Sequence, residues 1–75
     1  MGDLEKRLLD AFRSHSKGHV DKHLANISVL IKNPVGIGEH GDVIAEIEKE
    51  MMEVAKYDDM LSMLDKYFPQ ITLND

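Results

Sequence analysis

The stretch that decides the fold is Asn33-Pro34-Val35-Gly36-Ile37-Gly38-Glu39-His40-Gly41, near the middle of a chain of 75 residues. Pro34 has no backbone N–H and pushes Asn33 out of the α region, so a helix that arrives from the N-terminal side is expected to end here. The glycines that follow allow a tight reversal of the backbone. The stretch therefore predicts a loop over residues 33–41 that turns the chain back on itself.

The segments on both sides of this loop have the pattern of α-helices. Their apolar residues recur at spacings of three, four and seven, which is a helical period and not the alternation of a strand. Asp3 is a suitable N-cap for a helix over residues 3–32, with a possible kink or break at 14–18 because Gly18 is a poor helix former. Asp42 is the natural N-cap of a second helix over residues 42–68, and Pro69 ends it and leaves a tail over 69–75.

These elements predict a single all-α domain over residues 1–75, an antiparallel helical hairpin. The charges agree: residues 1–32 carry six basic and four acidic side chains, a net charge of +2, and residues 33–75 carry three basic and ten acidic ones, a net charge of −7. Two helices cannot surround a core, so we expect two hairpins to dimerise into a four-helix bundle, with a three-helix monomer broken near Gly18 as the alternative. The residues expected to carry the packing, in the core or at the dimer interface, are Leu8, Phe12, Ile27, Leu30, Ile44, Ile47, Met51, Val54, Leu61 and Leu64.

The composition excludes several classes of function. A net charge of −5 argues against a general nucleic-acid binder, which needs a basic surface. The chain has no cysteine, and its longest apolar run, Val29-Leu30-Ile31, is far shorter than the roughly 20 residues that span a bilayer. No catalytic arrangement of side chains is evident. We therefore expect a protein that is not an enzyme, needs no cofactor and does not enter a membrane. The lack of cysteine allows a reducing compartment such as the cytoplasm.

His15, His19 and His23 follow one another at intervals of four, which places them on one slowly drifting face of a helix. Two histidines at this spacing can share a zinc ion, so the row is a candidate metal site. The same residues could instead be polar residues at an interface, or a solvated surface. Histidines at an interface would make the assembly sensitive to pH near 6.

Two further features are candidate recognition sites. Glu39 and His40 stand at the tip of the predicted loop and could form a small epitope. The second helix carries the acidic series Glu46, Glu48, Glu50 and Glu53, which is expected to be a solvated face. An adaptor protein could use that face to bind another protein.

The loop phrase from Lys32 to His40, followed by Asp42 to Ile47 and then by Ala55-Lys56-Tyr57-Asp58, resembles small uncharacterised helical proteins of T4-like tailed phages, cyanophages among them. The resemblance covers about residues 25–68. It implies a phage-encoded accessory protein, either in the virion or in the cytoplasm of the infected host cell, with another phage protein or a host protein as a further partner. The resemblance implies no activity and no functional residue.

The sequence thus predicts a non-enzymatic structural or protein-interaction module that associates with itself. A metal- or pH-responsive regulator that depends on His15, His19 and His23 is the first alternative. An adaptor that binds a host protein through the acidic helix is the second.

Overall fold

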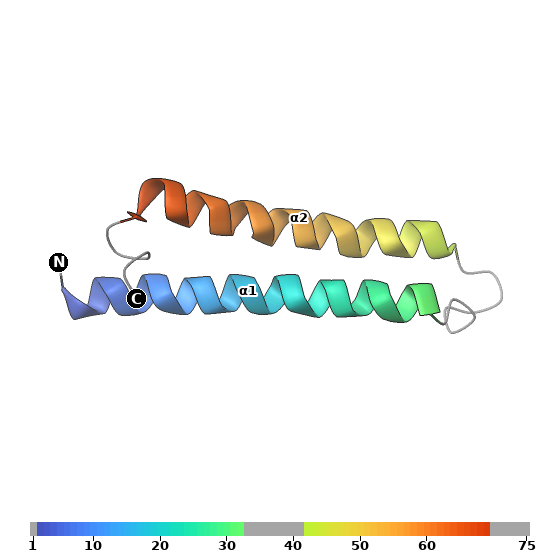
Figure 1. Cartoon of the computed structure of the whole chain (residues 1–75), viewed down its shortest axis with the longest axis horizontal. Helices are drawn as coiled ribbons and strands as arrows, with labels where there is room; N and C mark the ends of the chain where they lie inside the picture. Colours follow the sequence, from blue (N-terminus) through green and yellow to red (C-terminus); the bar gives the residue numbers. More distant parts are fainter. Residues whose placement is uncertain (1, 33–41, 70–75) are drawn as a thin grey trace.

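The computed structural model describes residues 2–32 and 42–69. Within these ranges the chain forms two α-helices and no strand: α1 over Asp3–Lys32 and α2 over Val43–Tyr67. The helices lie side by side and run in opposite directions (Figure 1), which confirms the predicted all-helical hairpin. The expected loop 33–41, with its candidate epitope Glu39 and His40, and the tail from residue 70 lie outside the described residues.

The ends of the helices follow from local chemistry. The side chain of Asp42 accepts a hydrogen bond from the backbone N–H of Ala45 at 3.0 Å, and its extended backbone (φ −92°, ψ 99°) is that of an N-cap residue. At the other end of α2 the N–H of Phe68 donates to the carbonyl of Leu64 at 2.8 Å. α1 continues through Gly18 as one helix, so the alternative of a third helix that begins there is wrong.

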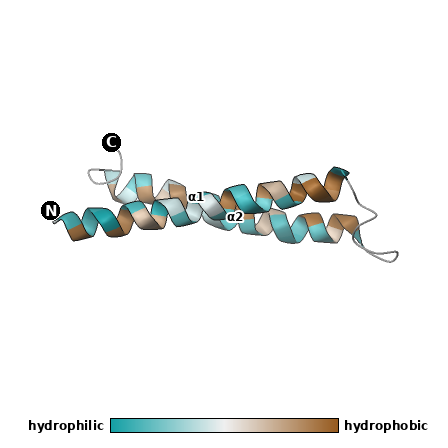
Figure 2. Cartoon of the chain, turned by 90° about the horizontal axis from the view of Figure 1, so that it is seen from below, coloured by the Kyte–Doolittle hydropathy of each residue, from teal (hydrophilic) through white to brown (hydrophobic). Residues whose placement is uncertain are grey.

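The hairpin is long and thin, 54 × 17 × 15 Å, and its core is small. Among the described residues, Ile27 and Leu64 are the only buried apolar side chains, with 7% and 4% of their surface exposed. The other two buried residues, Ser16 and His23, are polar. Figure 2 shows brown, hydrophobic residues toward the loop end of both helices and paler or teal ones near the middle of the hairpin.

The ten residues expected to carry the packing therefore have different environments in one hairpin. Ile27 and Leu64 are buried, and four more are half-buried: Leu30, Ile47, Val54 and Leu61. The remaining four, Leu8, Phe12, Ile44 and Met51, are exposed. The face of α1 that meets α2 contains Ser16, His23 and Ile27, whereas Leu8 is largely exposed and Phe12 is 38% exposed near the end of that face.

Candidate functional site

A hydrogen-bonded cluster joins the two helices at the middle of the hairpin. Nδ1 of His23 lies 2.6 Å from Oε1 of Glu50, and the side-chain amide of Asn26 donates to the same oxygen at 2.9 Å. Nε2 of His23 also approaches Oε1 of Glu53 at 3.9 Å. The hydrogen bonds from His23 and then from Asn26 hold the pKa of the Glu50 carboxyl below its ordinary value. Glu50 is therefore a carboxylate held between two groups of α1.

An aromatic stack continues this contact toward the open end of the hairpin, where α1 begins and α2 ends. The rings of His19 and Tyr57 lie almost parallel, with centroids 4.2 Å apart and 11° between their planes. His15 meets the same tyrosine edge-on at 5.8 Å and meets His19 at 4.5 Å. Partial burial, and after it the neighbouring His15, lower the pKa of His19 from its ordinary value. The predicted role of the histidines as polar residues at an interface thus fits His19 and His23, and the interface is the one between α1 and α2.

Polar residues extend this central region toward the open end of the hairpin. Oγ of Ser16, Nδ1 of His19 and Nε of Arg13 are buried atoms with no hydrogen-bond partner among the described residues. The guanidinium of Arg13 is nevertheless paired through its other end, since Nη2 donates to Oδ1 of Asp65 at 2.5 Å. The middle of the seam between the helices is therefore polar, and the few apolar contacts lie on either side of it.

The histidine row does not converge on a point that a metal ion could occupy. In residues 2–32 and 42–69 no three His, Asp or Glu side chains are placed so that they could hold a metal ion. The rings contact other groups instead: His23 contacts Glu50, His19 stacks on Tyr57, and His15 meets Phe12 and the same tyrosine. The geometry gives no support to the metal site expected from the spacing of four.

The acidic series of α2 is not one solvated face. Glu48 is exposed, but Glu46 pairs with Lys49 at 3.1 Å and Glu53 with Lys56 at 3.2 Å. The expectation is wrong for Glu50 in particular, because its carboxylate is turned toward α1 and bonded there. An adaptor surface that used Glu50 would have to break its hydrogen bonds to α1, whereas the ion pairs of Glu46 and Glu53 with lysines lie within α2.

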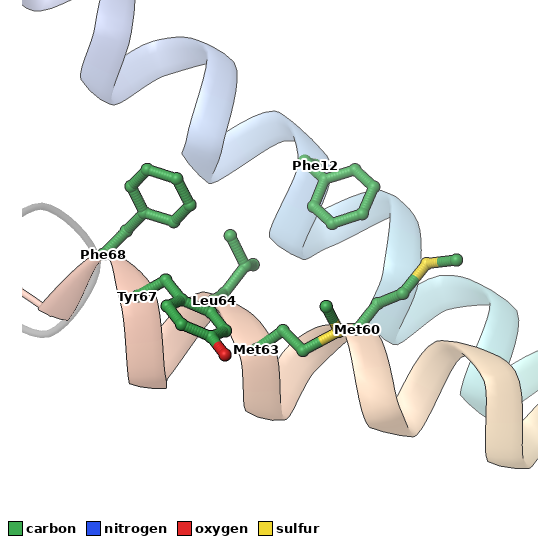
Figure 3. Close-up of a pocket in the computed structure, with 6 residues that line it drawn as sticks. All are labelled: Phe12, Met60, Met63, Leu64, Tyr67 and Phe68. Atoms are coloured by element: carbon green, nitrogen blue, oxygen red, sulfur yellow. The ribbon is translucent and has the colours of Figure 1, made fainter.

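Two apolar hollows lie on the outside of the hairpin. The first, at its open end, has a volume of about 510 Å³ (Figure 3). Phe12 is its single residue from α1, and the residues from α2 and its C-terminal end are Met60, Met63, Leu64, Tyr67 and Phe68. Figure 3 shows these side chains around an open space between the two helices, with only carbon and sulfur atoms and the tyrosine hydroxyl at its edge.

The second hollow, near the loop end, has a volume of about 530 Å³ and belongs to α2 alone. Its lining residues are Ile44, Ile47, Glu48, Met51, Met52 and Ala55. Since α1 contributes nothing to it, the other helix of the same hairpin does not cover these side chains.

Sequence reasoning missed Ser16, Asn26 and Tyr57 as members of the seam. A signal was available, because Ser16 stands seven residues before His23, and Tyr57 stands midway between Glu50 and Leu64 at the same interval. Polar residues at these positions hide the pattern, since serine, asparagine and tyrosine are not typical of an apolar stripe.

Comparisons of the chain with known protein families, with curated proteins and with solved structures find no match. The resemblance to phage proteins therefore stays a prediction. Within the part of the chain that the structure describes, neither helix has a stretch long and apolar enough to cross a membrane. The features that bear on function are the exposed apolar side chains and the polar contact between α1 and α2.

Proposed function

We propose that this chain is a non-enzymatic interaction module whose hairpin binds a second copy of itself, so that two hairpins form a four-helix dimer. The observation that carries the proposal is the contrast between a core that, in residues 2–32 and 42–69, has two apolar side chains and an exterior rich in apolar ones. Large hydrophobic side chains that are at least 38% exposed are Leu4, Leu8, Phe12, Leu24, Val29, Ile31, Ile44, Met51, Met52, Met63, Tyr67 and Phe68.

The exposed area has the size that a dimer would cover. A folded chain of 8.5 kDa exposes about 4,700 Å² by the usual scaling of area with mass, and this hairpin exposes 5596 Å². The surplus is about 900 Å², close to the roughly 800 Å² that each partner buries in a stable interface. Contact with one second copy would cover a surface of about that size on each chain.

The energetics point the same way. Full burial of a large apolar side chain contributes about 1.5–3 kcal/mol, so Ile27 and Leu64 together contribute only a few kcal/mol against the entropy of ordering two long helices. Small domains with so little core are commonly stabilised by oligomerisation. Folding and self-association are then linked, and the melting temperature should rise with protein concentration.

The lining of the two hollows supports protein binding over catalysis. Five of the six residues around the second hollow are apolar, and the first is lined by apolar and aromatic side chains. Methionine is prominent at both, and its flexible side chain adapts to a protein surface. A reaction needs convergent polar groups instead.

The test is the absolute mass in solution, measured by light scattering during size exclusion at pH 7.5, with chelator and with added zinc. We expect a dimer in both conditions. Ile44→Glu places a charge on a side chain that is 75% exposed in the hairpin and should yield the mass of one chain with helical circular dichroism retained. The matched control, Ala11→Glu, adds the same charge at an exposed position of α1 and should stay dimeric. A wild-type chain that runs at the mass of a monomer at every concentration contradicts the proposal, and assembly only with zinc would restore the histidine row as the functional site.

A further inference from the structure

One flank of α1 carries a short stripe that the hairpin leaves uncovered. Lys17, Leu24 and Ile31 are spaced by seven residues, close to two helical turns, so they share a flank of the helix. Leu24 is 45% exposed and Ile31 is 63% exposed, and Lys17 is exposed as well. The stripe is therefore basic toward the open end of the hairpin and apolar toward the loop end.

A second stripe with the same spacing lies on α2. Ile44, Met51 and Asp58 are also separated by seven residues, and all three are exposed, Ile44 at 75% and Met51 at 48%. Ile44 and Met51 line the hollow that belongs to α2 alone. This stripe is apolar toward the loop end and acidic farther along, the complement of the stripe on α1.

The charged ends of both stripes are without an ion-pair partner among the residues that the structure describes. Neither Lys17 nor Asp58 forms an ion pair with another residue of the described ranges, although four side chains of α2 are paired there with a basic group: Glu46, Glu50, Glu53 and Asp65. An unpaired cation on one helix and an unpaired anion on the other are what a complementary contact between two copies requires.

We infer that, in the self-association proposed above, α1 of the second copy docks along the hollow of α2, antiparallel to it and with the loop ends of both copies together. Because α1 runs toward the loop and α2 runs away from it with the same spacing, one register matches every member of the two stripes. It pairs Lys17 with Asp58, Leu24 with Met51, and Ile31 with Ile44. A two-fold axis along the hairpin forms this contact twice, and all neighbouring helices of the bundle are then antiparallel.

The competing arrangement places like helices in contact. In that dimer, with the loop ends together, Lys17 would face the same lysine of the second copy, or Asp58 the same aspartate, and like charges in an interface oppose binding. In the inferred arrangement, Lys17 of each copy faces Asp58 of the other copy, so neither repulsion arises. The net charges of the described helical segments agree, since α1 carries two more basic than acidic side chains, whereas α2 is acidic.

The test reverses the charge of Lys17 in one variant and of Asp58 in another. Sedimentation equilibrium at low salt measures the dissociation constant of each dimer. Lys17→Glu and Asp58→Lys should each weaken self-association by about tenfold, because each turns both copies of the ion pair into a repulsion. An equimolar mixture of the two variants should restore it, since each repelled group then meets an opposite charge. Circular dichroism of each variant checks that the hairpin is still folded.

Two controls have matched charges. Lys22→Glu reverses the same charge at a position about 140° from Lys17 around the axis of α1. Asp59→Lys reverses the same charge at a position about 100° from Asp58 around the axis of α2. Both should leave the dissociation constant within about twofold of wild type. If Lys17→Glu and Asp58→Lys behave like their controls while the wild type is a dimer, the register is wrong and self-association stands. A wild-type chain that is monomeric overturns the inferred register and the proposed self-association together.

Discussion

His23 and Glu50 meet across the middle of the hairpin, with 2.6 Å between Nδ1 and Oε1 and with Asn26 donating to the same oxygen. The pair lies where the apolar contacts are sparse, and the buried Ser16 and the half-buried Tyr57 follow it toward the open end of the hairpin. Apolar seams tolerate a shift of one helix along the other, whereas a buried polar pair matches in one register only. We attribute the alignment of α1 against α2 to this contact.

Replacing Glu50 by Ala should lower the free energy of unfolding by about 1–3 kcal/mol, because His23 and Asn26 lose their shared acceptor in a partly buried seam. Thermal melting followed by circular dichroism measures the change. Glu48→Ala is the control: Glu48 is exposed, and its removal should change the stability by less than about 0.5 kcal/mol. Equal effects of the two substitutions would show that the His23 contact contributes nothing.

Acidification should destabilise the fold in two steps. The pKa of His19 is lowered from 6.5 and the pKa of Glu50 from 4.5, so in both cases the folded chain binds the proton less readily than the unfolded chain. The stability that each group contributes is complete above its ordinary pKa and is lost as the pH falls below it. The melting temperature should therefore be highest above pH 6.5, fall toward pH 5.5, and fall again below pH 4.5.

His19→Gln should remove the upper step and leave the lower one. The charged or titratable neighbours of His19, which are His15, Lys22, His23 and Glu53, remain in this variant. Melting at fixed protein concentration between pH 4 and pH 8 provides the comparison. A variant whose stability falls as steeply as the wild type between pH 7 and pH 5.5 would assign the upper step to another group.

Leu64 and Leu8 should respond differently to truncation, although both belong to the predicted apolar stripes. Leu64 is 4% exposed and Leu8 is 61% exposed. Leu64→Ala should cost about 2–5 kcal/mol through the lost burial and the cavity left behind, whereas Leu8→Ala should cost less than about 0.5 kcal/mol in a single hairpin. Urea denaturation at a concentration where the chain is monomeric measures both. A comparable loss for the two variants would place Leu8 in the core.

Asp42 should contribute about 1 kcal/mol as the N-cap of α2, since its carboxylate accepts the N–H of Ala45 at 3.0 Å. Asp42→Ala removes this acceptor, and Asp42→Asn retains one. The alanine variant should melt lower than the asparagine variant. Identical melting temperatures for the two variants would show that the cap is not needed.

Gly18→Ala should stabilise the chain by about 0.5–1 kcal/mol, because alanine has the higher helix propensity and loses less backbone entropy on folding. A Cβ atom at residue 18 would have no heavy atom within 4 Å outside its own helix backbone, so the methyl group causes no clash in the hairpin. The expected result is a higher melting temperature with an unchanged mass in solution. A loss of stability or of dimer would mean that another surface approaches α1 at this glycine.

The sequence by itself determined the elements and their order. Pro34 and the glycines after it predict the break, and a period of three and four residues predicts helices on both sides. Asp42 caps α2 as predicted. Asp3, in contrast, is already the first residue of α1, and Gly2, whose carbonyl accepts the N–H of Lys6, takes the cap position expected of Asp3. These signals are local, because each depends on the backbone chemistry of a few neighbouring residues. The observed helices, Asp3–Lys32 and Val43–Tyr67, begin and end within one residue of the expected bounds.

Only the tertiary structure decided which face of each helix is buried. Apolar residues surround much of both helices, so the pattern allowed several seams, and hydrophobicity alone favoured Leu8 and Phe12 over Ser16 and His23. The choice depends on pairs that are distant in the sequence, such as His23 with Glu50 and Arg13 with Asp65, whose geometry requires both helices in place. The physical reason is that a hydrogen bond or ion pair fixes register through distance and direction, whereas apolar burial depends on area and leaves the register open.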